Sequence, residues 1–115
     1  MFNFYPRRLF LYSHFTDMRK NFDSLAALVE NQMSLNPTST DAFLFINKRK
    51  NRLKILIWED SGFWLLSKRL EIGTFSFQES PEQSSLLLSN SQFQLLLEGV
   101  VLLQSKQLKR YKKIS

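Results

Sequence analysis

At 115 residues, with 43% hydrophobic side chains and eleven phenylalanines, the chain is long enough for one folded domain and too short for two. Its 16 lysines and arginines exceed its 10 acidic residues, and the formal net charge of +6 favours an acidic partner such as nucleic acid. Alternatively, the excess charge serves only solubility. The absence of cysteine excludes disulfides, thiolate metal sites and a cysteine nucleophile.

The chain carries little that indicates hydrolytic chemistry or a membrane anchor. Its single histidine, His14, has no Gly-x-Ser-x-Gly motif to accompany it, so we interpret it as a surface or edge residue. No apolar run reaches the roughly 18–20 residues that a membrane span needs. Residues 1–15 mix aromatic side chains with proline and arginine, unlike a secretory signal. We therefore expect a cytoplasmic protein that needs neither cofactor nor metal.

The first part of the chain predicts a strand followed by a helix. Residues 9–13 are rich in β-forming side chains and predict a short strand. Thr16 or Asp17 is a suitable N-cap, and apolar residues recur at helical spacing from Met18 to Met33. We expect an amphipathic helix over Asp17–Met33, with its apolar stripe in the core and its end set by the polar, proline-containing segment that follows.

The middle of the chain predicts a series of antiparallel strands. Ala42–Ile46 is short and apolar, and Leu53–Trp58 is its expected partner. Gly62 can take the positive φ of a tight turn, so Phe63–Leu70 should return as a third strand, followed by a short one at Thr74–Phe77. Because Leu53–Trp58 is apolar on both faces, we expect cover on both faces, part of which a partner could supply.

A second helix is predicted near the end of the chain. Residues 79–85 form a polar linker, and Ser89 can cap a helix that continues to about Glu98, with Gly99 as its stop. Residues 106–113 hold five of the 16 basic residues, and we expect them to gain order only on an anionic surface.

Together these elements predict an α+β fold in a single small domain, residues 1–100, with a basic and mobile C-terminal tail at 101–115. The domain should contain a curled antiparallel sheet of three to five strands and two helices, in the order β-α-β-β-β-(β)-α.

A dense basic run separates the strands predicted at 42–46 and 53–58. A cationic loop at a hairpin tip suits contacts with phosphates, and Arg49 and Arg52 can also form bidentate hydrogen bonds to guanine. Alternatively, the charge keeps a solvated hairpin tip from aggregating. The predicted DNA-binding residues are Lys48, Arg49, Lys50, Arg52, Lys54, Lys68 and Arg69.

Three aromatic residues, Trp58, Phe63 and Trp64, crowd the next predicted turn. Tryptophan is enriched at interface hot spots, so these residues are candidates for binding a protein partner. The alternative is that they fill a small core.

Many short segments match one protein family in the same order. They are 16–20, 22–23, 25–29, 36–37, 43–45, 47–52, 54–56, Trp58, 62–65, 68–71, Gly73 and Phe75, with a weaker match over 88–99. In these segments the chain resembles the small accessory protein of insertion-sequence-66 transposable elements, usually called TnpB, which is distinct from the RNA-guided nuclease of that name.

The resemblance implies a protein encoded beside a larger transposase and a second small accessory protein, and needed for efficient transposition. The transposase reaction itself needs carboxylates that converge on two divalent metals, and a chain of this length lacks room for such a site. We therefore expect a non-catalytic accessory protein that binds DNA, at the ends of the element, through its basic loop. The alternative is an adaptor between the transposase and the second accessory protein, without direct DNA contact.

Overall fold

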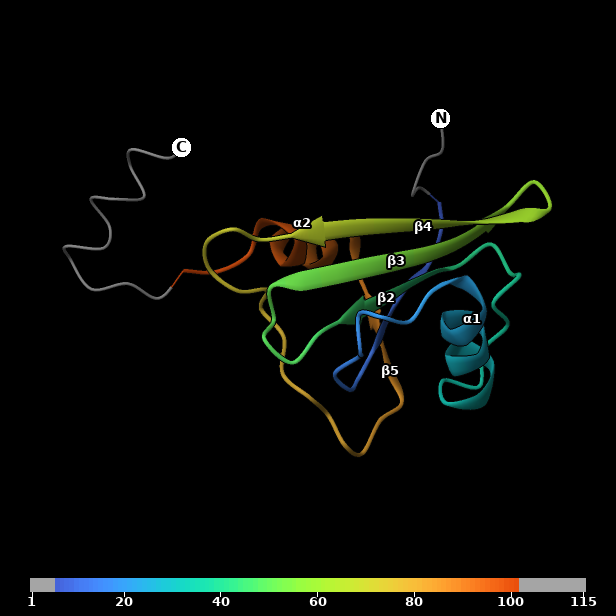
Figure 1. Cartoon of the computed structure of the whole chain (residues 1–115), viewed down its shortest axis with the longest axis horizontal. Helices are drawn as coiled ribbons and strands as arrows, with labels where there is room; N and C mark the ends of the chain where they lie inside the picture. Colours follow the sequence, from blue (N-terminus) through green and yellow to red (C-terminus); the bar gives the residue numbers. More distant parts are fainter. Residues whose placement is uncertain (1–5, 102–115) are drawn as a thin grey trace.

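The computed structural model describes residues 6–101, so most of the predicted tail lies outside the described residues. Five strands form one sheet in the spatial order β4-β3-β2-β1-β5, accompanied by two helices (Figure 1). The α+β class and the predicted order of elements are confirmed. In chain order the elements are β1 (Leu9–Tyr12), α1 (Phe22–Asn31), β2 (Ala42–Ile46), β3 (Arg52–Glu59), β4 (Gly62–Arg69), β5 (Ser85–Leu88) and α2 (Asn90–Glu98).

One strand pair differs from the antiparallel sheet that was predicted. β1 and β2 are parallel, with Leu9 opposite Ala42, whereas the other three pairs are antiparallel. Parallel neighbours need a crossover connection, which the segment containing α1 provides. The sheet is therefore mixed.

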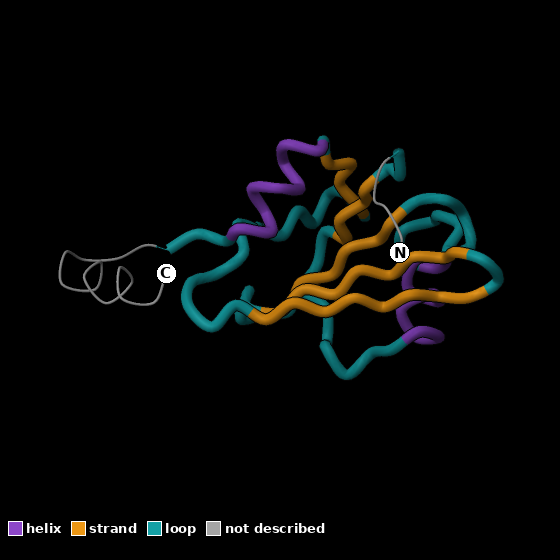
Figure 2. The backbone as a smooth tube through the Cα atoms, turned by 90° about the horizontal axis from the view of Figure 1, so that it is seen from above, coloured by secondary structure: helices purple, strands orange, loops and turns teal. Residues whose placement is uncertain are grey.

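The central strands are covered on both faces, as their sequence predicted. Leu53, Ile55 and Ile57 of β3 face one hydrophobic cluster, and Leu56 faces the other. The α2-side core consists of Leu9, Leu11, Ala42, Leu44, Ile46, Leu53, Ile55, Ile57, Phe75, Phe77, Phe93 and Leu96. The α1-side core consists of Leu25, Leu28, Val29, Met33, Phe43, Phe45 and Leu56. Figures 1 and 2 show the two helices at different ends of the sheet. Residues of this chain therefore cover both faces of the central strands.

α1 is shorter than the helix predicted over Asp17–Met33. The N-cap is Asn21, whose N–H donates to the Ser24 hydroxyl at 2.9 Å. Asp17 instead accepts a hydrogen bond from the Arg19 N–H at 2.9 Å and closes a separate turn before the helix. The prediction failed because the side chain of Asp17 satisfies a local turn in preference to a helix cap.

The turn between β3 and β4 also differs from the prediction. Asp60 and Ser61 have φ values of 50° and 68°, and Gly62 is the first residue of β4. Positive φ at both central residues is the geometry of a type I′ turn, whose twist matches that of the strands it joins. The left-handed positions are therefore filled by Asp60 and Ser61, without glycine.

The last strand lies outside the segment where a short strand was predicted. Residues 74–77 make only an isolated bridge, between Thr74 and Val100, while Phe75 and Phe77 are buried in the α2-side core. The strand is β5, which begins at the end of the predicted polar linker and pairs with β1. α2 forms as predicted, with the Ser89 hydroxyl accepting from the backbone at its start and Gly99 at its C-cap with φ of 77°.

Two glycine-to-alanine substitutions should have different effects on stability. Gly73 has φ of 85°, and a Cβ there would lie 2.8 Å from the Val100 carbonyl oxygen. We expect Gly73→Ala to lower the free energy of unfolding by at least about 1 kcal/mol, because of backbone strain and this clash. Gly62→Ala, with nothing within 4 Å of the added Cβ, should have no effect or stabilise by up to about 1 kcal/mol. Urea denaturation measures both, and equal losses would contradict the assignment of strain to Gly73.

Candidate nucleic-acid interface

Residues 47–52, the basic turn, join β2 to β3 and are held from within by one asparagine. The Asn47 side-chain oxygen accepts from the N–H groups of Asn51 and Arg52 at 3.1 and 2.9 Å. Its amide nitrogen donates to the Asn51 side-chain oxygen at 2.8 Å. A side-chain amide that binds the backbone in this way fixes the shape of the turn without using any of its charged groups.

The segment that follows β4 holds the basic turn from outside. The Phe75 N–H donates to the Lys50 carbonyl at 2.7 Å, and the Leu70 N–H donates to the Asn51 carbonyl at 2.8 Å. Lys50 has φ of 59°, which is unusual for a residue with a side chain. Strained backbone of this kind persists only where the surroundings enforce it, and here Asn47 and the 70–75 segment do so.

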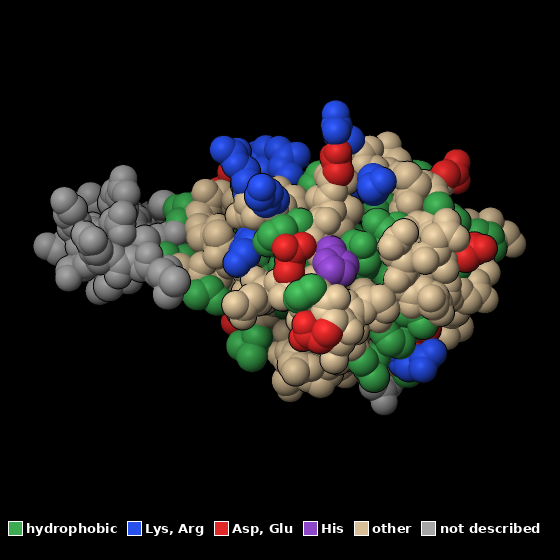
Figure 3. All heavy atoms as spheres, turned by 90° about the horizontal axis from the view of Figure 1, so that it is seen from below, with side chains coloured by type: hydrophobic (Ala, Val, Ile, Leu, Met, Phe, Trp, Pro, Cys, Tyr) green, Lys and Arg blue, Asp and Glu red, His purple; other side chains and the backbone are tan. Residues whose placement is uncertain are grey.

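The basic turn presents three cations to solvent. Lys48, Arg49 and Arg52 are exposed, while Lys50 is half-buried. Within residues 6–101, no carboxylate forms an ion pair with any of these four. Figure 3 shows lysine and arginine side chains gathered on one part of the surface. The basic turn therefore has cationic groups available for an anionic ligand.

Lys68 and Arg69 of β4 lie beside the basic turn, and both already make contacts within the protein. The strand register places Arg69 opposite Arg52 and Lys68 opposite Leu53. The Lys68 ammonium donates to the Leu97 carbonyl at 2.7 Å, near the C-terminal end of α2, where the helix dipole favours a cation. Arg69 forms an exposed ion pair with Glu71 at 2.7 Å.

Lys54 is placed differently from the other predicted DNA-binding residues. Its ammonium donates to the carbonyls of Met18 and Lys20 at 2.7 and 2.8 Å, and so holds the turn that precedes α1 against the sheet. This side chain is partly buried and its hydrogen bonds are used within the fold. Lys54 therefore serves the fold and is separate from the exposed cations of the basic turn.

An open hollow of about 410 Å³ separates the basic turn from the turn that precedes α1. One wall holds an ion pair, in which the Arg19 guanidinium contacts the Asp17 carboxylate at 2.6 Å. Hydrogen bonds from Arg19 lower the pKa of Asp17 to about 2, so this carboxylate is ionised at neutral pH. The lining residues are Thr16, Asp17, Met18, Asn47, Lys48, Arg49, Asn51 and Arg52.

The three aromatic residues predicted to bind a partner lie at the opposite end of the β3–β4 hairpin and do not form one surface. Trp58 and Phe63 pack edge to face at 4.9 Å on the α1 side of the sheet. Trp64 pairs with Ile57 on the other side, is 50% exposed, and donates to Glu59 at 3.2 Å. Five to six residues of β3 separate the level of these aromatics from Arg52, so at about 3.3 Å per residue they lie about 17–20 Å from the nearest end of the basic turn.

The sequence interpretation missed the residues that give the basic turn its shape. Asn47 and Asn51 lie near its two ends, and asparagine in a turn commonly hydrogen-bonds to nearby backbone. The role of these two residues could therefore have been predicted from the sequence. The support from Leu70 and Phe75 was not, because it comes from a distant part of the chain.

Over residues 6–101, no group of three or more His, Cys, Asp or Glu side chains is placed to hold a metal ion. In the same range, no helix is both long and apolar enough to cross a membrane.

Comparison with known proteins assigns the chain to a family. Residues 7–107 match the family model of the IS66 Orf2-like proteins. The chain belongs to this family. It is similar to two uncharacterized proteins of Sinorhizobium fredii, y4hO and y4jC, each 36% identical to it. The match to y4hO covers 81% of this chain and 80% of the relative, and the match to y4jC covers 73% and 71%. No solved structure matches.

The family assignment confirms the resemblance found in the sequence and defines the biological setting. IS66 Orf2-like proteins are accessory proteins of transposition, so this chain is an accessory protein of an IS66-type element. The matched range includes the basic turn and both ends of the β3–β4 hairpin.

Replacing Asn47 with alanine should loosen the basic turn without changing its charge. Asn47→Ala leaves the N–H groups of Asn51 and Arg52 without their acceptor, and we expect a loss of about 1–3 kcal/mol in the free energy of unfolding. Asn47→Asp keeps the acceptor and should lose less. Urea denaturation and amide hydrogen exchange at Asn51 and Arg52 measure the effect. Unchanged exchange in Asn47→Ala would show that the backbone bonds alone hold the turn.

Proposed function

We propose that this IS66 Orf2-like protein is a non-catalytic accessory factor that binds DNA through its basic turn. The main supporting observation is the combination of exposed cations with a turn of fixed shape. Lys48, Arg49 and Arg52 have no carboxylate partner within residues 6–101, while Asn47 and the 70–75 segment hold their backbone. A preformed cationic loop binds phosphates without first having to become ordered.

Two kinds of DNA contact follow from these side chains. The ammonium of Lys48 suits phosphate contacts, which position a protein on the duplex without reading its sequence. Arg49 and Arg52 carry guanidinium groups, which can bind a phosphate or the O6 and N7 atoms of guanine in a bidentate manner. Arg52 also faces Arg69 across the strands, and Arg69 has an anionic partner in Glu71, whereas Arg52 has none among residues 6–101.

In its biological setting, the DNA is expected to be the ends of the parent element. The protein partners would be the transposase and the second accessory protein of the same element. The protein would then contribute positioning of the DNA, while the transposase supplies the metal-dependent chemistry.

Charge reversal should locate the DNA contacts. In the first variant, Lys48, Arg49, Lys50 and Arg52 are changed to glutamate, and in the second, Lys106, Lys109, Arg110 and Lys112 are changed instead. Both variants lose the same net charge. With about 0.9 units of log–log salt slope per phosphate contact, the first variant should bind DNA with a slope less steep by about 3–4 units. Fluorescence anisotropy on a labelled end of the element, titrated with salt, measures this.

A scrambled duplex of equal length is the control for sequence reading. Equal affinities for the two duplexes would assign the basic turn to phosphate contacts alone. A larger loss in the second variant than in the first would contradict the assignment to the basic turn and move it to the C-terminal residues.

The exposure of Trp64 supports a second candidate function, as an adaptor between the transposase and the second accessory protein. Trp64 is 50% exposed and lies far from the basic turn, so both functions could operate together. We expect Trp64→Ala to weaken capture of the transposase or the accessory protein at least about tenfold, as hot-spot tryptophans do. Charge reversal in the basic turn should leave that capture unchanged. If Trp64→Ala has no effect on either interaction, the adaptor assignment fails at this residue.

A further inference from the structure

The segment formed by β5 and α2 is unlike the rest of the chain in charge. From Ser84 to Leu97 the sequence contains no charged residue, although charged residues make up 23% of the chain. The same segment contributes two of the most exposed large apolar side chains, Leu87 at 60% and Leu95 at 63%. Single exposed leucines are common, but these two lie on an uncharged strand and an uncharged helix that contact each other.

β5 is also an outer strand with unpaired backbone on one side. It pairs only with β1 among the described strands, and the Ser13 N–H donates to the Ser84 carbonyl at 3.2 Å. In an antiparallel pair, every second residue of a strand hydrogen-bonds to the same neighbouring strand. Since Ser84 bonds to the chain at Ser13, the N–H and C=O groups of Leu86 and Leu88 also point toward β1. Ser85 and Leu87 direct their N–H and C=O groups away from the sheet.

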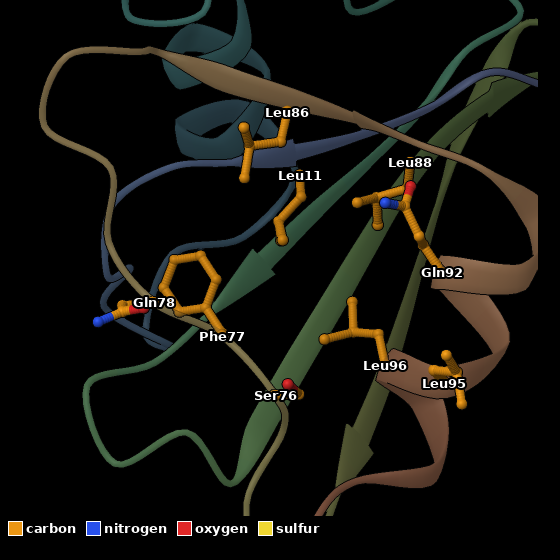
Figure 4. Close-up of a pocket in the computed structure, with 9 residues that line it drawn as sticks. All are labelled: Leu11, Ser76, Phe77, Gln78, Leu86, Leu88, Gln92, Leu95 and Leu96. Atoms are coloured by element: carbon orange, nitrogen blue, oxygen red, sulfur yellow. The ribbon is translucent and has the colours of Figure 1, made fainter.

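The side chains of β5 place an apolar hollow beside this open edge. Leu86 and Leu88 lie opposite Leu11 and Leu9 and therefore face the α2 side. Between them and α2 is a hollow of about 270 Å³ (Figure 4). Its lining residues are Leu11, Ser76, Phe77, Gln78, Leu86, Leu88, Gln92, Leu95 and Leu96.

The opposite edge of the sheet does not have these properties. β4 carries Lys68 and Arg69, and charged side chains on an edge strand oppose pairing with another chain. Open strand edges are usually protected by such charges, by proline or by a bulge, and β5 has no charge and no proline within it.

From these observations we propose that β5 and α2 bind a second copy of this chain, with the two β5 strands pairing antiparallel across a twofold axis. Ser85 of each copy would then face Leu87 of the other, so that the outward backbone groups on both strands are satisfied. On the α2 side, Leu86 of each copy would meet Leu86 of the other beside the two hollows, and Leu87 would lie on the opposite face of the joined sheet. The proposal concerns a different surface from the basic turn and does not depend on DNA binding.

Self-complementarity favours a second copy as the occupant, because two antiparallel β5 strands match the outward N–H and C=O groups of Ser85 and Leu87 with one another. Copies with a net charge of +6 repel each other, and this uncharged surface is where they can approach with least repulsion. A strand of four residues is only about 13 Å long, so the contact buries less than the roughly 800 Å² per partner of a standard interface. We therefore expect a weak dimer, with a dissociation constant of micromolar order.

Two substitutions test the proposal without entering the core. Leu87→Lys places a charge at an exposed position of the pairing edge. Ser85→Pro removes an outward N–H while leaving the bonds to β1 in place. Gln94→Lys, at an exposed position of α2 away from the hollow, is the matched control for added charge. Circular dichroism and the urea midpoint show whether each variant is folded.

Sedimentation velocity on the full chain, at concentrations from well below to well above about 10 µM, gives the dissociation constant. We expect a concentration-dependent dimer whose dissociation constant rises at least about tenfold in Leu87→Lys and Ser85→Pro and by less than about twofold in Gln94→Lys. A full chain that is monomeric at every concentration would overturn the proposal. So would a dimer that neither edge substitution weakens, because the contact would then lie elsewhere.

Discussion

Two adjacent strands that are apolar on both faces determine how the rest of this small chain is arranged. β2 is buried along its whole length, and β3 is buried on both faces over much of its length. Since strands of this kind must be covered on both sides, α1 is needed on one face, and α2 with the segment after β4 on the other. The same requirement connects the core to the candidate interface. Phe75 fills the α2-side core with its side chain and supports the Lys50 carbonyl with its N–H.

The sequence indicates most of this fold because the local signals and the final packing agree. β3 was predicted to be apolar on both faces, and it places Leu53, Ile55 and Ile57 in the α2-side core and Leu56 in the α1-side core. The signals at Ser89 and Gly99 correctly placed both ends of α2. The errors occur at two turns, where the sequence allows more than one local structure. Asp17 closes a turn with Arg19 in place of capping α1, and the turn at residues 60–61 adopts positive φ without glycine.

Other features could not be read from the sequence because they depend on contacts between distant segments. The parallel pairing of β1 with β2 depends on the path of the intervening chain, and β5 becomes a strand only beside β1. The same limit applies to the candidate interface. The dense charge of the basic turn is visible in the sequence, but only the fold shows that Lys54 is bound by the carbonyls of Met18 and Lys20. Lys48 and Arg49, by contrast, remain exposed.

The construction of the basic turn has a consequence for how the family can change over evolution. Its shape is maintained by Asn47 and by backbone hydrogen bonds from the segment after β4, and the side chains of Lys48 and Arg49 make none of these contacts. Replacements at positions 48 and 49 therefore carry little penalty in folding. A transposable element that diverges in the sequence of its ends could acquire matching side chains at these positions while the scaffold stays constant. Among relatives, variation should then concentrate at these two positions and be rare at Asn47.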